Sequence, residues 1–126
     1  MKSPSLIASF RFAFEGVLYA FRTQRNFKIH CVIALLVLIV GVWFGLTTDQ
    51  WAILAVVTGL VFQAELINTS IEAITDRASP DIHPLAKVAK DCAAAGVLVS
   101  AVVAVAVGAL IFLPRLAALL EVAQAR

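Results

Sequence analysis

The chain has 126 residues, of which 62% are hydrophobic and only 14% are charged, and its net charge at pH 7 is +2. A soluble domain typically carries about 25% charged residues, and a chain this short cannot hide the excess of apolar side chains in a core. The composition also excludes a disordered chain. Because the charge is small and no dense basic patch is present, a nucleic-acid partner is not expected. The sequence predicts a single membrane domain covering residues 1–126.

An amphipathic helix is predicted over about residues 4–24. Apolar side chains recur there at helical spacing, whereas Arg11, Glu15 and Arg22 share another face, which is typical of a helix lying on a membrane surface. Packing of this helix against the rest of the protein is an equally open interpretation. A cleavable signal peptide is not expected, since these residues hold no apolar core followed by a small-residue cleavage site.

Three membrane-spanning helices are predicted after it, over about residues 28–47, 51–76 and 84–113. Each contains a long run without charged residues, and a helix needs about 20 predominantly apolar residues to cross a bilayer. The middle span reaches this length only if it continues through Glu65 to about Glu72. Ionisable residues at membrane depth are energetically costly and usually functional. The second span is therefore the predicted location of a functional site.

The distribution of Lys and Arg predicts the orientation. Five of them precede the first span, none lies at residues 47–50, three lie between residues 77 and 90, and two follow the third span. Because positive residues are enriched on the cytoplasmic side, the N-terminus and the second loop are expected in the cytoplasm and the C-terminus outside.

A stripe of polar residues follows one face of the second predicted span, at Glu65, Asn68, Glu72 and Asp76. These positions are separated by three or four residues, which keeps them on one side of a helix. Counted from Trp51, Glu65 lies about 21 Å into the span, and Glu72 lies about 10 Å further along the axis. The stripe is therefore predicted to run from the headgroup boundary into the cytosol.

Three interpretations of this stripe are open. A transmembrane ion or proton path is poorly supported, since the outer halves of the spans are apolar apart from Thr58 and Ser100. The stripe would also serve as a structural polar seam between subunits. The third interpretation is interfacial chemistry, in which a carboxylate at headgroup depth acts on a lipid while carboxylates nearer the cytosol hold a metal or cofactor.

The segment after the stripe favours the third interpretation. Asp81 is expected to cap a new helix that has Pro84 in its first turn. Polar side chains then fall on one face of that helix, at His83, Lys87, Lys90 and Asp91. Lysines beside carboxylates at a membrane surface suit a nucleoside triphosphate and its Mg²⁺. Taken singly, the lysines are explained by positive-inside anchoring and His83 by a solvated loop.

Together these two segments resemble the prokaryotic diacylglycerol kinase family, which includes undecaprenol kinases. The resemblance rests on the pattern E-x-x-N-x-x-x-E-x-x-x-D over residues 65–76, followed by H-x-x-x-x-x-x-K-D over residues 83–91. It covers nearly the whole chain, including the surface helix and the segment from Arg25 to His30.

The resemblance implies a fold and a reaction. Members of this family are integral membrane enzymes of the bacterial inner membrane, with a surface helix and three transmembrane helices, and they form homotrimers with composite active sites. They transfer the γ-phosphate of MgATP to a lipid hydroxyl at the cytoplasmic interface. An all-α membrane lipid kinase is therefore expected, with ATP, Mg²⁺, a membrane lipid and further copies of the chain as its partners. The alternative is a non-catalytic membrane subunit or transporter-like protein that keeps the stripe for assembly.

The resemblance also implies roles for single residues. Glu65 matches the general base and Glu72 a metal-binding carboxylate. The positions that match nucleotide-contacting residues are Asn68, Asp76, Asp81, His83, Lys90 and Asp91. Gln24 stands where the family typically has a second metal-binding glutamate, and its neutral amide is expected to weaken metal binding. Both undecaprenol and diacylglycerol present a primary hydroxyl, so the pattern leaves the substrate open.

Overall fold

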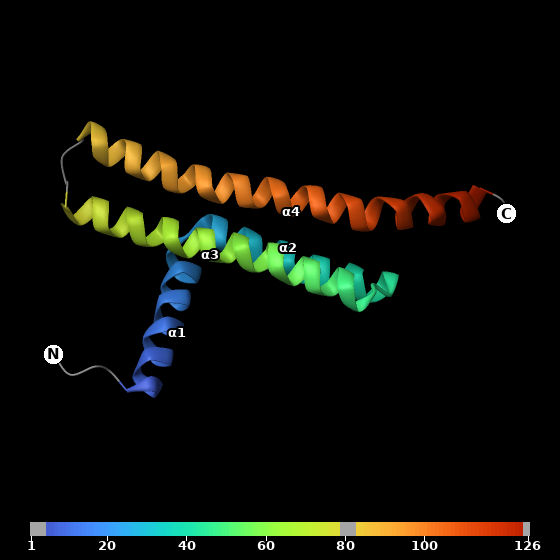
Figure 1. The fold of residues 1–126 in the computed structure, drawn as a ribbon, viewed down its shortest axis with the longest axis horizontal. Coiled ribbons are helices and arrows are strands. Elements are labelled where there is room, and N and C mark those ends of the chain that lie inside the picture. Colours follow the sequence, from blue (N-terminus) through green and yellow to red (C-terminus); the bar gives the residue numbers. More distant parts are fainter. Residues whose placement is uncertain (1–4, 79–82, 125–126) are drawn as a thin grey trace.

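The computed structural model describes residues 5–78 and 83–124. These residues form four α-helices: α1 (Leu6–Thr23), α2 (Arg25–Phe44), α3 (Thr48–Ala78) and α4 (Pro84–Gln124) (Figure 1). The all-helical architecture that the sequence predicted is therefore confirmed. Asp81, expected to cap the last helix and to contact a nucleotide, lies outside the described residues.

Helix α1 stands apart from the other three and leaves them at a steep angle (Figure 1). Its first turn is capped by Ser5, whose Oγ accepts a hydrogen bond from the amide of Ala8 at 3.3 Å. Its last residue is followed by Gln24 in an extended conformation, which separates α1 from α2. Ala20 is the buried residue of α1, whereas most of its large apolar side chains are exposed, among them Leu6, Phe10 and Phe14. This exposure fits a helix that lies on a membrane surface.

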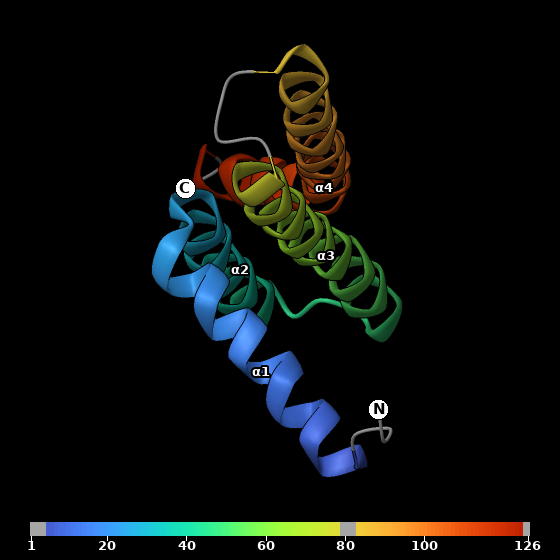
Figure 2. The ribbon, with the colours of Figure 1, turned by 90° about the vertical axis from the view of Figure 1, so that its left-hand side faces the viewer.

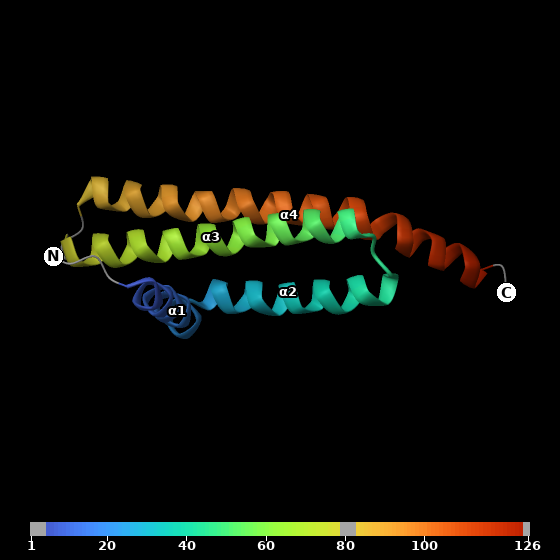
Figure 3. The same ribbon diagram turned by 60° about the horizontal axis from the view of Figure 1, so that its bottom comes forward.

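Helix α3 is the central element, with α2 on one side and α4 on the other (Figures 2 and 3). Helices α3 and α4 run antiparallel and lie side by side over most of the length of α3 (Figure 3). Helices α2, α3 and α4 are each long and apolar enough to cross a membrane. Many of their large hydrophobic side chains are exposed, as expected for a membrane protein whose outer surface faces lipid.

The turn between α2 and α3 depends on two glycines. Gly45 ends α2 with a φ of +62°, in the left-handed region that glycine adopts without strain. One turn earlier, Gly41 lets the ring of Trp51 pack directly on the α2 backbone, because a Cβ at Gly41 would lie 2.6 Å from Trp51 Cη2. A small core forms beside this turn from Leu46, Leu54 and Ile111.

Helix α4 extends beyond the predicted span at residues 84–113. It continues through Pro114 to Gln124 and bends near its C-terminal end (Figure 3), as a proline inside a helix favours. The next residue, Arg115, donates a hydrogen bond from Nη2 to Gln50 Oε1 at 2.7 Å. Arg115 thereby links α4 to the first turn of α3.

The contact at Gly41 gives a stability prediction. Gly41→Ala forces the ring of Trp51 to move, and we expect the free energy of unfolding to fall by about 1–3 kcal/mol, measured by denaturant or SDS titration in detergent. Gly59→Ala is the matched control, because a Cβ at Gly59 meets no atom within 4 Å and alanine is the better helix former. Equal stability of the two variants would contradict the packing described here.

Candidate active site

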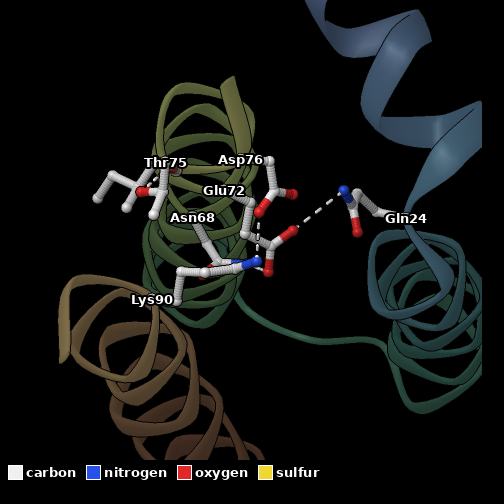
Figure 4. Close-up of polar contacts among 7 residues, drawn as sticks. Gln24, Asn68, Glu72, Thr75, Asp76 and Lys90 are labelled. Carbon is white, nitrogen blue, oxygen red and sulfur yellow. Dashed lines mark hydrogen bonds and ion pairs between the residues drawn. The ribbon is translucent and has the colours of Figure 1, made fainter. Parts of the chain in front are cut away.

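The polar stripe on α3 passes from the interior of the protein to its surface. Glu65 is 1% exposed and Asn68 is 8% exposed, whereas Glu72 is half-buried and Asp76 is exposed. The four residues share one helix face, as the spacing predicted, and Figure 4 shows three of them pointing into the space between α3, α4 and the junction of α1 with α2. The stripe therefore has a buried end and a solvent-exposed end.

Two amide groups bind the carboxylate of Glu72 (Figure 4). Asn68 Nδ2 donates to Glu72 Oε1 at 3.0 Å, and Gln24 Nε2 donates to Glu72 Oε2 at 3.3 Å. Gln24 reaches α3 because it is the extended residue between α1 and α2. Glu72 thus connects the surface helix to the central helix, and each of its oxygens accepts a hydrogen bond.

Glu65 is the most deeply buried polar residue of the described chain. Its Oε1 lies 3.3 Å from Nε2 of His30 on α2. Helices α2 and α3 are held together here by Phe27 and Phe62, whose ring centroids are 5.2 Å apart. Sequence reasoning did not assign a role to His30. The available signal was its place in the segment from Arg25 to His30, which is part of the family resemblance.

A polar pocket and an apolar groove meet at this point. The polar pocket has a volume of about 280 Å³, and its polar lining comes from Glu65, Asn68, Glu72, Asn26 and His30. The groove, of about 230 Å³, lies between α2, α3 and α4 and is lined almost wholly by apolar residues. The two share His30 and Ala101. Glu65 therefore lies where an apolar chain and a polar group would meet.

The exposed end of the stripe contacts α4. Lys90 Nζ lies 2.7 Å from Asp76 Oδ1 (Figure 4), which brings together two of the residues predicted to contact a nucleotide. Lys87 and Asp91 form a separate ion pair on the exposed face of α4.

His83 lies at the start of α4. It directly precedes α4, and its Nδ1 accepts a hydrogen bond from the amide of Leu85 at 3.2 Å. In this structure the imidazole caps the first turn of α4, a role that the sequence analysis gave to Asp81.

Comparison with known proteins identifies the family. A family model described as prokaryotic diacylglycerol kinase matches residues 11–112. The chain belongs to this family. It is therefore a membrane lipid kinase, a phosphotransferase, and the non-catalytic alternative considered from the sequence is not favoured.

The relatives of this kinase carry two different names. A diacylglycerol kinase from Synechocystis sp. is 44% identical over 119 residues, which cover 94% of this chain and 68% of the relative. An undecaprenol kinase from Bacillus subtilis is also 44% identical over 108 residues, covering 86% of this chain and 88% of the relative. A diacylglycerol kinase from Escherichia coli is 29% identical over 100 residues, covering 79% and 82%.

Membership of a kinase family implies the use of ATP, for which Mg²⁺ is the typical ion. Within the described residues, no group of three or more His, Cys, Asp or Glu side chains is arranged to hold a metal. Mg²⁺ in kinases is commonly bound by one or two carboxylates together with phosphate oxygens. Glu72, which lines the polar pocket at the solvent-exposed side of Glu65, fits this mode of binding.

Proposed function

We propose that this kinase transfers the γ-phosphate of MgATP to the primary hydroxyl of a membrane lipid, undecaprenol or diacylglycerol, at the cytoplasmic face of the bacterial inner membrane. One observation carries the proposal. Glu65 is buried in the polar pocket beside His30, which also borders the apolar groove, and a base acting on a lipid hydroxyl requires such a position. The groove suits the hydrocarbon and the pocket suits the phosphates.

In this proposal Glu65 is the general base. The lipid hydroxyl enters the pocket with its chain in the groove, and Glu65 accepts the hydroxyl proton as the oxygen attacks the γ-phosphorus. The new bond joins the lipid oxygen to phosphorus, the bond between the γ-phosphorus and the bridging oxygen breaks, and ADP leaves. The products are a lipid phosphate, ADP and a proton, which Glu65 releases afterwards.

The nucleotide would bind at the exposed end of the stripe. Lys90 donates to phosphate oxygens and offsets the charge that develops during transfer. Asn68 and Asp76 orient the nucleotide, and His83, Asp81 and Asp91 are proposed as further contacts near the start of α4. The rise of about 10 Å between Glu65 and Glu72 separates the lipid end of the site from the nucleotide end.

Glu72 is the proposed ligand of Mg²⁺, which when bound neutralises phosphate charge. Gln24, the doubtful second ligand in the sequence analysis, offers Glu72 an amide N–H rather than a metal-binding carboxylate. We propose that Gln24 holds Glu72 in place and that the metal is bound with fewer protein charges than a second glutamate would supply.

The arrangement in the membrane follows from the charges and the family. The site is proposed to face the cytoplasm, with the N-terminus inside and the C-terminus outside, because most Lys and Arg residues lie at the site end of the helices. A homotrimer with composite active sites is proposed from the family. The exposed apolar faces of α2 and α4 are consistent with further helices packing there. Cross-linking in native membranes tests whether the chain forms a trimer.

The first functional prediction concerns the lipid substrate and Glu65. Because relatives of equal identity are named for undecaprenol and for diacylglycerol, both lipids are offered separately with radiolabelled ATP in mixed micelles. Phosphorylation of at least one is expected, and Glu65→Gln should lower that rate by about 10²–10⁴-fold. Glu15→Gln, at an exposed residue of α1, is the control. The proposal fails if neither lipid is phosphorylated or if Glu65→Gln keeps the wild-type rate.

The second prediction concerns Lys90. Lys90→Met removes the cation proposed to face the phosphates, and we expect kcat/KM for ATP to fall by about 100-fold. Arg77→Met is the matched control, since Arg77 is an exposed basic residue of α3 that has no role in the proposed site; its effect should be small. Equal losses of kcat/KM in the two variants would show that ATP use depends on positive charge in general and not on Lys90 in particular.

The third prediction concerns Gln24. Gln24→Glu places a second carboxylate against that of Glu72. We therefore expect the thermal midpoint of this variant to fall when a chelator removes divalent metal and to recover when Mg²⁺ is added. Mn²⁺ affinity, measured by EPR with a non-hydrolysable ATP analogue, should rise by about tenfold because a charged ligand is added. Thr23→Glu, at the neighbouring exposed residue, controls for the added charge. If the Mn²⁺ affinity of Gln24→Glu is unchanged, position 24 does not belong to the metal site.

A further inference from the structure

His30 lies beside the carboxylate of Glu65. It comes from α2, the helix opposite α4, and its Nε2 lies 3.3 Å from Glu65 Oε1. The imidazole is 19% exposed and the Glu65 side chain is 2% exposed. The contact is therefore made inside the protein, at the point shared by the polar pocket and the apolar groove.

The side-chain hydrogen bonds that the structure shows beside Glu65 are not directed to its carboxylate. Among the described residues, Glu65 Oε1 is a buried oxygen that accepts no hydrogen bond, although His30 Nε2 lies 3.3 Å from it. The neighbouring amide of Asn68 is directed to Glu72, and Thr69 Oγ1 donates to the backbone oxygen of Glu65, not to its carboxylate. Helix α4 lines the pocket with apolar side chains alone. An unpartnered oxygen on a buried carboxylate is costly, so the orientation of Glu65 depends on His30.

We propose that His30 is a positioning residue for the general base. A rotation of the imidazole, whose Nε2 already lies 3.3 Å from Glu65 Oε1, would direct Nε2–H to this unpartnered oxygen. That hydrogen bond would fix the carboxylate and leave Oε2 to accept the proton of the lipid hydroxyl. Both the neutral Nε2–H tautomer and the imidazolium can make this donation, so the role does not require His30 to change its charge. The inference rests on the proposed function of Glu65 and adds the residue that makes its geometry productive.

A fixed base matters because the efficiency of proton transfer depends steeply on position. A misplacement of about 1 Å can cost about 100-fold in rate. His30 borders both the groove and the pocket, but because it acts through Glu65, its loss should lower kcat far more than it changes KM for ATP or for the lipid. A residue that served only to bind the lipid would instead raise KM.

The test uses three variants of the full-length kinase in mixed micelles, assayed with the lipid that the wild type phosphorylates. His30→Leu removes the donor, and we expect kcat to fall by about 100-fold. His30→Gln places an amide N–H the same number of bonds from the backbone as Nε2 and should recover most of the rate. His30→Asn places its N–H one bond closer to the backbone and should stay as low as His30→Leu.

A double-mutant cycle supplies the decisive control. In the background of Glu65→Gln, His30→Leu should have no further effect on kcat, because the two residues act as one unit. The thermal midpoints of all variants show whether each of them is folded. If His30→Leu is unfolded, the proposal is tested by comparing His30→Gln with His30→Asn.

The outcomes separate this inference from the proposed function. If Glu65→Gln abolishes activity while His30→Leu keeps the wild-type kcat, the inference is wrong and the proposed function stands. It is also wrong if His30→Gln is as slow as His30→Asn, or if the losses from His30→Leu and Glu65→Gln add. If the wild type phosphorylates neither lipid, the proposed function itself fails.

Discussion

The structure is organised around one energetic problem, the burial of a carboxylate within an apolar helical protein. Glu65 is 1% exposed, and an ionisable group in such a place is costly unless polar groups contact it. His30 of a neighbouring helix lies 3.3 Å from this carboxylate, although Glu65 Oε1 accepts no hydrogen bond among the described residues. That contact depends in turn on the packing of α2 against α3 through Phe27 and Phe62. The helix packing and the site are therefore parts of the same arrangement.

The exposure of the remaining polar side chains increases along α3. Glu72 is half-buried and accepts hydrogen bonds from Asn68 and Gln24, so it is held without being charge-paired. Asp76, further along, is exposed and is paired with Lys90 from α4. Partners thus change from an imidazole to amides and then to an ammonium as the helix passes toward solvent. Under the proposed function, the buried end of this helix face would serve the lipid and the exposed end the nucleotide.

Much of this could be predicted from the sequence, for reasons that are local. The spacing from Glu65 to Asp76 places the stripe on one helix face, and the uncharged runs predict the long helices, since both depend only on helical periodicity. His30 was not found, because it is 35 residues from Glu65 in the chain and no periodic pattern connects them. The continuation of α4 through Pro114 was also missed, because proline usually ends a helix. Here the guanidinium of Arg115 accompanies the bend by donating to the oxygen of Ile111 and to Gln50.

The sequence by itself determined the class of protein, the helices and the polar stripe on α3, because composition and periodicity act through the backbone and its neighbours in the chain. Only the tertiary structure decided which of these residues meet. The extended residue at Gln24 turns its amide toward Glu72, 48 positions away, and the packing of α2 on α3 brings His30 to Glu65. Contacts between helices depend on how their surfaces pack, and the spacing of residues within a single helix does not contain that information.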